Sequence, residues 1–306
     1  MDKILYGGFS RGELNIFAGG SGSGKSLVMM NIALSWLQAG LSGVYISLEL
    51  SEELCALRTD AMLAGMSTKE IRKDIDQATL KVRLVSKKTG QYRIKALPAQ
   101  SNINDIRSYI KEVQVQTGLK VDFVMCDYLD LLMPVSAKVS PNDLFVKDKY
   151  VSEELRNLAK ELNVLFVTAS QLNRSAVEEV EFDHSHISGG ISKINTADNV
   201  FGIFTSRAMR ERGKYQIQCM KSRSSTGVGM KIDLDYNIET MRITDPGEEA
   251  GPVNSFARGN LLDSIKAKST MINGTEPVAA HEETSRLTAD VQSAKLKQLL
   301  GQIKAN

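Results

Sequence analysis

The sequence contains at residues 19–26 the stretch Gly19-Gly20-Ser21-Gly22-Ser23-Gly24-Lys25-Ser26, which matches the pattern G-x-x-x-x-G-K-[ST]. Glycines at these places allow main-chain N–H groups to turn inward and surround phosphates without a side-chain clash. In this pattern Lys25 reaches the β- and γ-phosphates and the Ser26 hydroxyl holds magnesium. An apolar run precedes the stretch and an apolar helical segment follows it, a context that a merely flexible glycine loop does not need. The stretch therefore predicts a binding site for a nucleoside triphosphate and magnesium.

Apolar strands and helices alternate along the chain on both sides of this stretch. Hydrophobic periodicity predicts helices at 26–38, 51–64, 104–116 and 142–163. It predicts strands at 13–18, 44–48, 81–86, 92–97, 121–126, 164–168, 200–205, 215–220 and 230–236. Such alternation predicts an α/β fold with a doubly wound, mostly parallel sheet, helices on both faces, and a C-terminal antiparallel hairpin.

Composition limits the class of protein. The chain has 306 residues, of which 42% are hydrophobic. Its 38 Lys and Arg nearly balance its 36 Asp and Glu, so the protein lacks the overall positive charge of a protein that wraps nucleic acid. Its three cysteines lack metal-ligand spacing, and no apolar run is long enough to cross a membrane, which favours a reducing cytoplasm. We expect one domain over 1–244 and a flexible tail over 245–306. The spacing of apolar residues over 287–303 predicts a short amphipathic helix. It is either a helix of marginal stability on the flexible tail or a peptide that docks on a partner.

Three predicted strands end in polar side chains that ATP hydrolysis could use. Glu49 follows the strand at 44–48, Asp127 follows the strand at 121–126, and Gln171 follows the strand near 164–168. Each alone has another interpretation: Asp127 as a turn residue, Glu49 as part of the next helix, and Gln171 as an ordinary polar residue. Because parallel strands end at the same edge of a sheet, we expect the three to meet beside the phosphate loop, with Asp127 binding magnesium through water.

A resemblance to a known family rests on three segments in this order. They are Tyr45-Ile46-Ser47-Leu48-Glu49-Leu50-Ser51, Cys126-Asp127-Tyr128-Leu129-Asp130-Leu131-Leu132 and Ser170-Gln171-Leu172-Asn173-Arg174-Ser175. In these segments the chain resembles the DnaB-type replicative helicases of the RecA-like hexameric superfamily. The spacing of these segments, with a tyrosine directly after Asp127, also resembles that of the replicative helicases of T-even bacteriophages. The similarity covers roughly residues 5–236.

The resemblance implies a role for each polar strand end. Glu49 corresponds to the glutamate that activates water, Asp127 to the Walker B acid, and Gln171 to the glutamine that links the γ-phosphate to DNA-binding loops. Lys221 and Arg223, at the end of the strand at 215–220, correspond to a pair that reaches the ATP site of the neighbouring subunit. Without the family context, these two cations would be interpreted as a solvated basic hairpin.

The family also implies where single-stranded DNA binds. Loops after the Walker B strand and after the glutamine strand grip DNA in the pore of the ring, and here they are 133–149 and 173–193. The candidate contacts are Arg174, Gly189, Gly190 and Lys193.

We therefore expect an ATP-dependent replicative DNA helicase motor that moves on single-stranded DNA as a hexamer in a bacterial or phage-infected cytoplasm. Movement from 5′ to 3′, and a primase or helicase loader as partner, are implied by the resemblance alone. The family's N-terminal domain and linker helix have no counterpart before residue 5, which leaves ring assembly and primase contact by this chain open. The alternatives are a recombinase-like or clock-type ATPase without processive unwinding, and an accessory ATP-binding module.

Overall fold

The computed structural model describes residues 1–136, 139, 143–171 and 191–248. Within these residues one sheet contains nine strands, in the order β3-β2-β4-β5-β1-β6-β7-β8-β9. The strands are β1 (Leu14–Gly19), β2 (Gly43–Ser47), β3 (Tyr92–Ala96), β4 (Phe123–Asp127), β5 (Leu165–Gln171), β6 (Asn199–Ile203), β7 (Lys214–Ser222), β8 (Lys231–Tyr236) and β9 (Ile243–Thr244). The helices are α1 (Lys25–Gln38), α2 (Glu52–Ala64), α3 (Thr68–Lys73), α4 (Ile75–Ser86), α5 (Ile103–Thr117), α6 (Leu144–Leu162), α7 (Ile191–Thr196) and α8 (Arg207–Glu211), with a 3-10 turn, η1 (Leu129–Leu131), after β4.

The sheet has a parallel part and an antiparallel part. The strands from β3 to β6 in the sheet order run parallel to one another, whereas β7, β8 and β9 are added antiparallel. Strands β1, β2 and β4 are buried along their whole length, as expected for parallel strands that are covered on both faces. The predicted α/β fold with a C-terminal antiparallel hairpin is confirmed.

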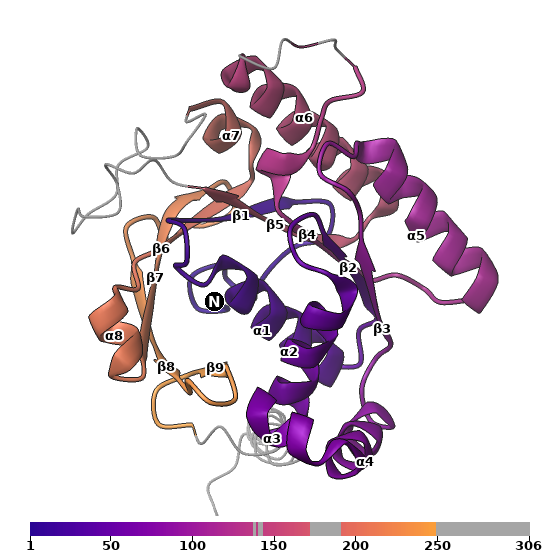
Figure 1. Ribbon diagram of the computed structural model, residues 1–306. Helices are drawn as coiled ribbons and strands as arrows, with labels where there is room; N and C mark the ends of the chain where they lie inside the picture. The colour runs from indigo at the N-terminus through magenta and orange to yellow at the C-terminus, as the bar shows by residue number, and fades with distance from the viewer. Residues whose placement is uncertain (137–138, 140–142, 172–190, 249–306) are drawn as a thin grey trace, which may run out of the picture. The chain divides into compact units, whose positions relative to one another are not determined.

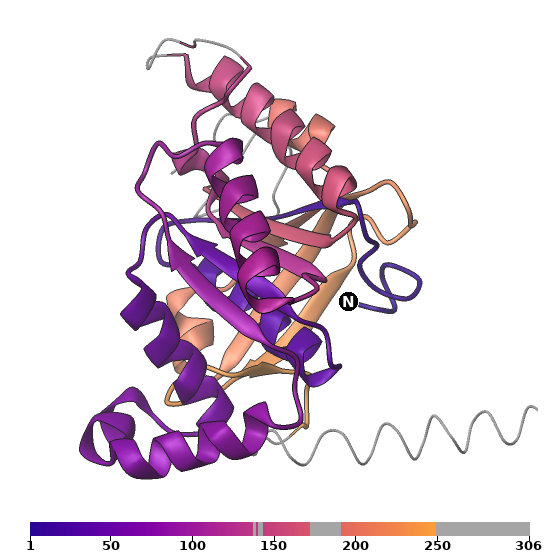
Figure 2. The same cartoon turned by 90° about the vertical axis from the view of Figure 1, so that its right-hand side faces the viewer.

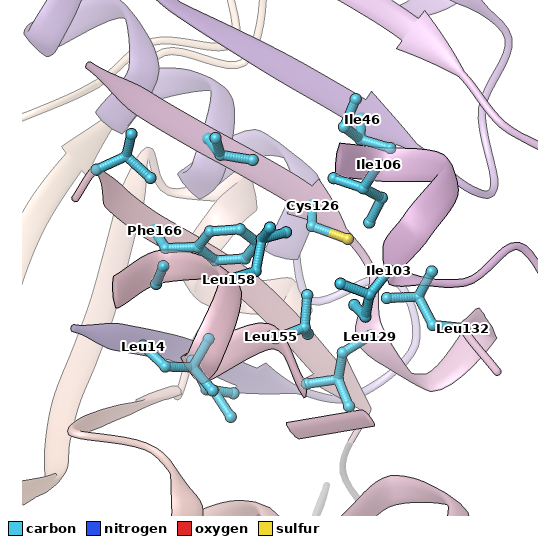
Figure 3. Packing of buried hydrophobic residues seen from close by; sticks show 14 of the residues in the cluster. Leu14, Ile46, Ile103, Ile106, Cys126, Leu129, Leu132, Leu155, Leu158 and Phe166 are labelled. Atoms are coloured by element: carbon cyan, nitrogen blue, oxygen red, sulfur yellow. The ribbon is translucent and has the colours of Figure 1, made fainter. Parts of the chain in front are cut away.

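Helices cover both faces of the parallel part (Figures 1 and 2). On one face α5 and α6 pack on the sheet, and Figure 3 shows Ile106 of α5 and Leu155 of α6 beside Phe166 and Cys126 of the strands. On the other face α1 packs against Phe17 and other strand residues. Burial of these two apolar layers holds the strand ends of the sheet in place.

The prediction of a strand at 81–86 is wrong, because these residues form the end of helix α4. The alternation of Val82 and Leu84 indicated a strand, but Leu84 is 50% exposed. Ala78 and Val85 are buried, at the spacing of one helix face, and the side chain of Asp74 caps the helix by accepting the N–H of Gln77 at 2.9 Å. Six residues of alternation were too short to separate the two periods.

The end of the described chain lies close to the predicted domain boundary. Strand β9 ends at Thr244, and the predicted tail and its helix at 287–303 lie outside the described residues. None of the helices that the structure describes is both long and apolar enough to cross a membrane.

Candidate active site

The loop between β1 and α1 has the backbone conformation that the glycines of the motif allow. Gly22 and Gly24 have φ angles of 68° and 96°, in the left-handed region that residues with a Cβ avoid. A Cβ atom on Gly24 would lie 3.0 Å from the Tyr215 hydroxyl oxygen. That hydroxyl donates to the carbonyl oxygen of Ser23 at 3.0 Å. The loop is therefore held by β7 as well as by its own glycines.

Lys25, the first residue of α1, lies against this loop. Its Nζ donates to the carbonyl oxygens of Gly19 at 3.1 Å and of Gly20 at 3.0 Å. Burial lowers the pKa of Lys25, while the nearby carboxylates of Asp127 and Glu49 act to raise it. An ammonium group that donates to main-chain carbonyl oxygens can be transferred to a phosphate, which is a stronger acceptor.

A cavity of about 300 Å³ lies beside the loop. It brings together seven of the predicted site residues: Ser21, Gly22, Gly24, Lys25 and Ser26 of the phosphate loop, with Glu49 and Gln171 of the strand ends. Its lining is formed by Ser21, Gly22, Gly24, Lys25, Ser26, Leu27, Glu49, Leu50, Arg58, Tyr128, Gln171, Arg210 and Met241. A cavity lined by glycine main chain, cations and a carboxylate is suited to a phosphate group and the water that attacks it.

The strand register explains why the polar strand ends meet. Gln171 is paired with Gly19 across β5 and β1, and Asp127 is paired with Ser47 across β4 and β2. Because all four strands are parallel, their carboxyl ends lie at the same edge of the sheet as the phosphate loop. Glu49 lies in the bend after β2.

The alternative placement of Glu49 inside the next helix does not occur. The side chain of Ser51 caps α2 by accepting the N–H of Leu54 at 3.3 Å, and the helix begins at Glu52. Glu49 is exposed and lines the cavity, so its carboxylate is accessible to a bound water.

Asp127 is fully buried at the end of β4. Its Oδ2 accepts the Tyr45 hydroxyl at 2.6 Å, whereas its Oδ1 is buried without a hydrogen-bond partner among the described residues. Burial, together with the Asp127 carboxylate, keeps the pKa of Tyr45 well above its usual value, so Tyr45 remains a donor. An unpartnered carboxylate oxygen is a fitting ligand for magnesium or for one of its waters.

Lys221 and Arg223 lie away from this cavity. The end of β7 that carries them pairs with the amino end of β6, whereas the phosphate loop follows the carboxyl end of β1, which is parallel to β6. Lys221 Nζ donates to the carbonyl oxygens of Asn195 at 3.0 Å and Ala197 at 2.8 Å, and Arg223 Nη2 donates to that of Asn195 at 2.6 Å. Burial, with Arg223 beside it, lowers the pKa of Lys221 to about 8.

Six cavity residues were not predicted as site residues: Leu27, Leu50, Arg58, Tyr128, Arg210 and Met241. Arg210 of α8 donates to the Gly22 carbonyl oxygen, and the Tyr128 ring lies 5.8 Å from Lys25 Nζ. The adjacency of Tyr128 to Asp127 was a usable signal. The sequence around Arg58 and Arg210 gave no such signal, because it is the packing of α2 and α8 that brings these two residues to the loop.

The predicted DNA contacts are only partly within the described residues. Arg174, Gly189 and Gly190 lie outside them. Lys193 is 1% exposed, and its Nζ is within 2.5 Å of an oxygen of Asp130 and 2.7 Å of an oxygen of Asp148. This burial corrects the prediction for Lys193, whose ammonium belongs to the interior of the chain and not to a surface for DNA.

Residues 1–245 match the model of a family described as the DnaB-like helicase C terminal domain. The chain belongs to this family. This DnaB-like domain is therefore an ATP hydrolase, in agreement with the phosphate loop and the polar strand ends.

Two curated relatives illustrate the extent of the sequence similarity. The DnaB-like replicative helicase of Enterobacteria phage T4 is 29% identical over 229 residues, which are 73% of this chain and 48% of the relative. The replicative DNA helicase DnaB of Helicobacter pylori is 31% identical over 176 residues, which are 55% of this chain and 34% of the relative. The DnaB-like domain thus spans about half the length of the phage relative and less than half the length of the bacterial relative.

Solved structures share the fold. A DnaB-like replicative helicase, described together with its interactions with primase, superposes with a TM-score of 0.67 over 80% of this chain and 59% of that one, at 19% identity. The ATPase domain of G40P superposes with a TM-score of 0.65 over 80% of this chain and 88% of that one, at 19% identity. The α/β fold of this DnaB-like domain, with its mostly parallel sheet and C-terminal antiparallel strands, is therefore that of the matched helicase structures.

Proposed function

We propose that the cavity beside the phosphate loop binds ATP and that Glu49 activates the attacking water. Lys25 leaves the carbonyl oxygens of the loop for the β- and γ-phosphates, and the main-chain N–H groups of the loop surround them. Glu49 accepts a proton from the water, and Gln171 contacts the γ-phosphate. The convergence of Lys25, Glu49 and Gln171 on one cavity carries this proposal.

Magnesium is held, in this proposal, by the Ser26 hydroxyl and, through water, by Asp127. When bound, the ion neutralises charge that develops on the β- and γ-phosphate oxygens. The unpartnered Oδ1 of the buried Asp127 supports this role, since a lone buried carboxylate oxygen is costly without a ligand.

Lys221 and Arg223 complete the site of a second copy of the chain. They lie at the edge of the sheet opposite to their own phosphate loop, so within one chain they do not contribute to the cavity. Two cations supplied across an interface would stabilise the charge on the transferred phosphoryl group, which makes hydrolysis depend on assembly. A hexamer, as implied by the family, fulfils this requirement.

The function that we infer is that of a replicative helicase motor that moves on single-stranded DNA in the cytoplasm, with 5′ to 3′ polarity. The named relatives are replicative helicases, and the chain spans half or less of their length, so unwinding is proposed for the protein that contains this domain. Contact with a primase or a loader stays a prediction from the family.

The substitution Glu49→Gln tests the chemistry. We expect it to lower ATP turnover by about 10²- to 10⁴-fold with nucleotide binding retained, because only the base is removed. Glu53→Gln, the same change on the exposed first turn of α2, is the matched control. Turnover by Glu49→Gln equal to that of the control would leave an accessory ATP-binding module as the better interpretation.

Strand separation on forked DNA tests the motor. We expect ATP-dependent unwinding of a fork with a 5′ single-stranded tail and none of a fork that carries only a 3′ tail. ATP turnover stimulated by DNA without unwinding of either fork would instead favour a recombinase-like ATPase.

A further inference from the structure

A buried charged cluster joins four elements next to the candidate active site. Its central residue is Lys193 of α7, whose Nζ lies 2.5 Å from Asp130 Oδ1 of η1 and 2.7 Å from Asp148 Oδ2 of α6. The same Nζ lies 3.2 Å from the Ser170 hydroxyl of β5. Lys193 is 1% exposed and Asp148 is 4% exposed, so these contacts are made in the interior of the chain. The ammonium group of Lys193 in α7 therefore connects three other elements: η1, which follows β4, the end of β5, and helix α6.

The cluster also contacts the main chain of Gln171. The second oxygen of Asp130, Oδ2, accepts the Gln171 N–H at 3.3 Å, while the first is paired with Lys193. Lys147 supports the same arrangement, because its Nζ donates to the Asp130 carbonyl oxygen at 2.5 Å. Asp130 follows Asp127 by three residues, so both carboxylates are positioned by the same strand end. Besides its pairing with Gly19 of β1, the main chain of Gln171 is thus held by a carboxylate that Lys193 contacts.

The position of these residues along the chain adds a second observation. Asp130 lies three residues before the first predicted DNA segment (133–149), and Asp148 is its second-to-last residue. Ser170 lies three residues before the second segment (173–193), and Lys193 is its last residue. The cluster therefore brings together, next to Gln171, four described residues that lie at or near the ends of both segments in sequence.

Stability alone does not require such a cluster. Burying an ammonium and the Asp148 carboxylate, and partly burying that of Asp130, costs solvation that apolar side chains of similar volume would not lose. Burial raises the pKa of Asp148, and Lys193 acts in the opposite direction. Charged groups in this setting specify one geometry, because their partners cannot shift without leaving a buried charge unpaired.

We propose that Lys193 is a positioning residue for ATP hydrolysis, which holds the Asp130 carboxylate and through it the main chain of Gln171 beside the phosphates. The same contacts link a displacement of α6 or α7 to the position of Gln171. This inference rests on the proposed role of Gln171 in the site.

Lys193→Met tests the proposal in the full-length chain with magnesium and single-stranded DNA. We expect the kcat for ATP to fall by about 10- to 100-fold, because a misplaced group near the reacting atoms loses rate. The KM for ATP should change by less than about threefold, since the phosphate loop is untouched. Hydrogen exchange of the peptide that contains Gln171 should become faster, because its N–H loses a fixed acceptor. Lys111→Met, the same change at an exposed site on α5, should alter none of these quantities.

The single substitution removes the ammonium that lies between Asp130 and Asp148 and leaves Asp148 with only the more distant Lys147, at 3.5 Å, so a folding defect could follow. The triple variant Asp130→Asn/Asp148→Asn/Lys193→Met removes this imbalance. A merely structural cluster predicts that the melting temperature and the kcat of the triple variant recover together. The positioning role predicts that the melting temperature recovers while the kcat stays low and exchange at Gln171 stays fast.

Gln171→Ala separates the inference from the proposed function. If Gln171→Ala lowers the kcat and Lys193→Met does not, the positioning role is wrong and the role of Gln171 stands. If neither variant lowers the kcat, the role of Gln171 is wrong, and the role of Lys193 falls with it. Unchanged exchange at Gln171 in Lys193→Met also overturns the inference.

Discussion

Removal of the Tyr45 hydroxyl tests the support of the Asp127 carboxylate. The hydroxyl donates to Asp127 Oδ2 at 2.6 Å, and both residues are fully buried. In Tyr45→Phe the carboxylate loses this donor, and a hydrogen bond to a charged group contributes about 1.5–3 kcal/mol. For a domain of this size each kcal/mol shifts the melting temperature by about 2–4 °C, which gives a loss of about 3–12 °C.

The same substitution should weaken magnesium binding, because Tyr45 orients the proposed metal ligand. Partners of metal ligands typically change metal affinity by about 10- to 100-fold. We therefore expect the magnesium concentration for half-maximal ATP turnover to rise by about tenfold or more in Tyr45→Phe. Thermal unfolding without magnesium, followed by magnesium titration of turnover, measures the two effects separately.

Tyr92→Phe is the matched control for this experiment. The Tyr92 ring lies 6.4 Å from the Tyr45 ring, and its hydroxyl oxygen is buried without a partner among the described residues. Its removal should leave stability equal or slightly higher, since no hydrogen bond is lost. Equal losses in both variants, or no loss in Tyr45→Phe, would refute the argument for the Asp127 support.

Three further predictions concern the loop and the hairpin. Gly24→Ala should abolish nucleotide binding in an equilibrium assay, because a residue with a Cβ is strained at this backbone conformation and the Cβ would lie 3.0 Å from the Tyr215 hydroxyl. The control is Gly118→Ala, where φ is 67° and the space around the Cβ is open. This substitution should destabilise the fold and leave nucleotide binding intact. Arg210→Ala should raise the KM for ATP, measured by steady-state turnover, because Arg210 lines the cavity and donates to the loop. Burial lowers the Lys221 pKa from 10.5 to about 8, so the unfolded chain binds more protons between these values. The free energy of unfolding of the wild type, compared with Lys221→Met in chemical denaturation, should therefore rise as the pH increases through this range; a constant difference would contradict the shift.

The phosphate loop and the polar strand ends could be predicted from sequence for local reasons. The loop motif contains its own chemistry, and apolar runs that end in Glu49, Asp127 and Gln171 need only a parallel sheet to bring these residues together. The structure has that sheet, and the register of its strands places their carboxyl ends at the edge of the sheet where the phosphate loop lies.

Other features depend on contacts between distant parts of the chain. Lys193, a charged residue near a predicted loop, was expected at the surface, but two carboxylates far away in sequence pair with it in the interior. Arg210 reaches the phosphate loop because α8 follows the carboxyl end of β6, which is parallel to β1 and ends at the same edge of the sheet as the loop. The helix α4 was missed because a few alternating residues are compatible with both a strand and one side of a helix.

Subunit mixing tests the central claim, that one ATP site is completed by two copies of the chain. Lys25→Ala removes the phosphate contact and keeps the hairpin, whereas Arg223→Ala keeps the loop and removes the hairpin cation. A mixture of the two contains interfaces with an intact loop and an intact Arg223, so we expect ATP turnover above the sum of the separate variants. A mixture of Arg223→Ala with the double variant Lys25→Ala/Arg223→Ala contains no such interface and sets the baseline. Turnover of the first mixture at this baseline, in samples whose mass shows mixed assemblies, would contradict a shared site.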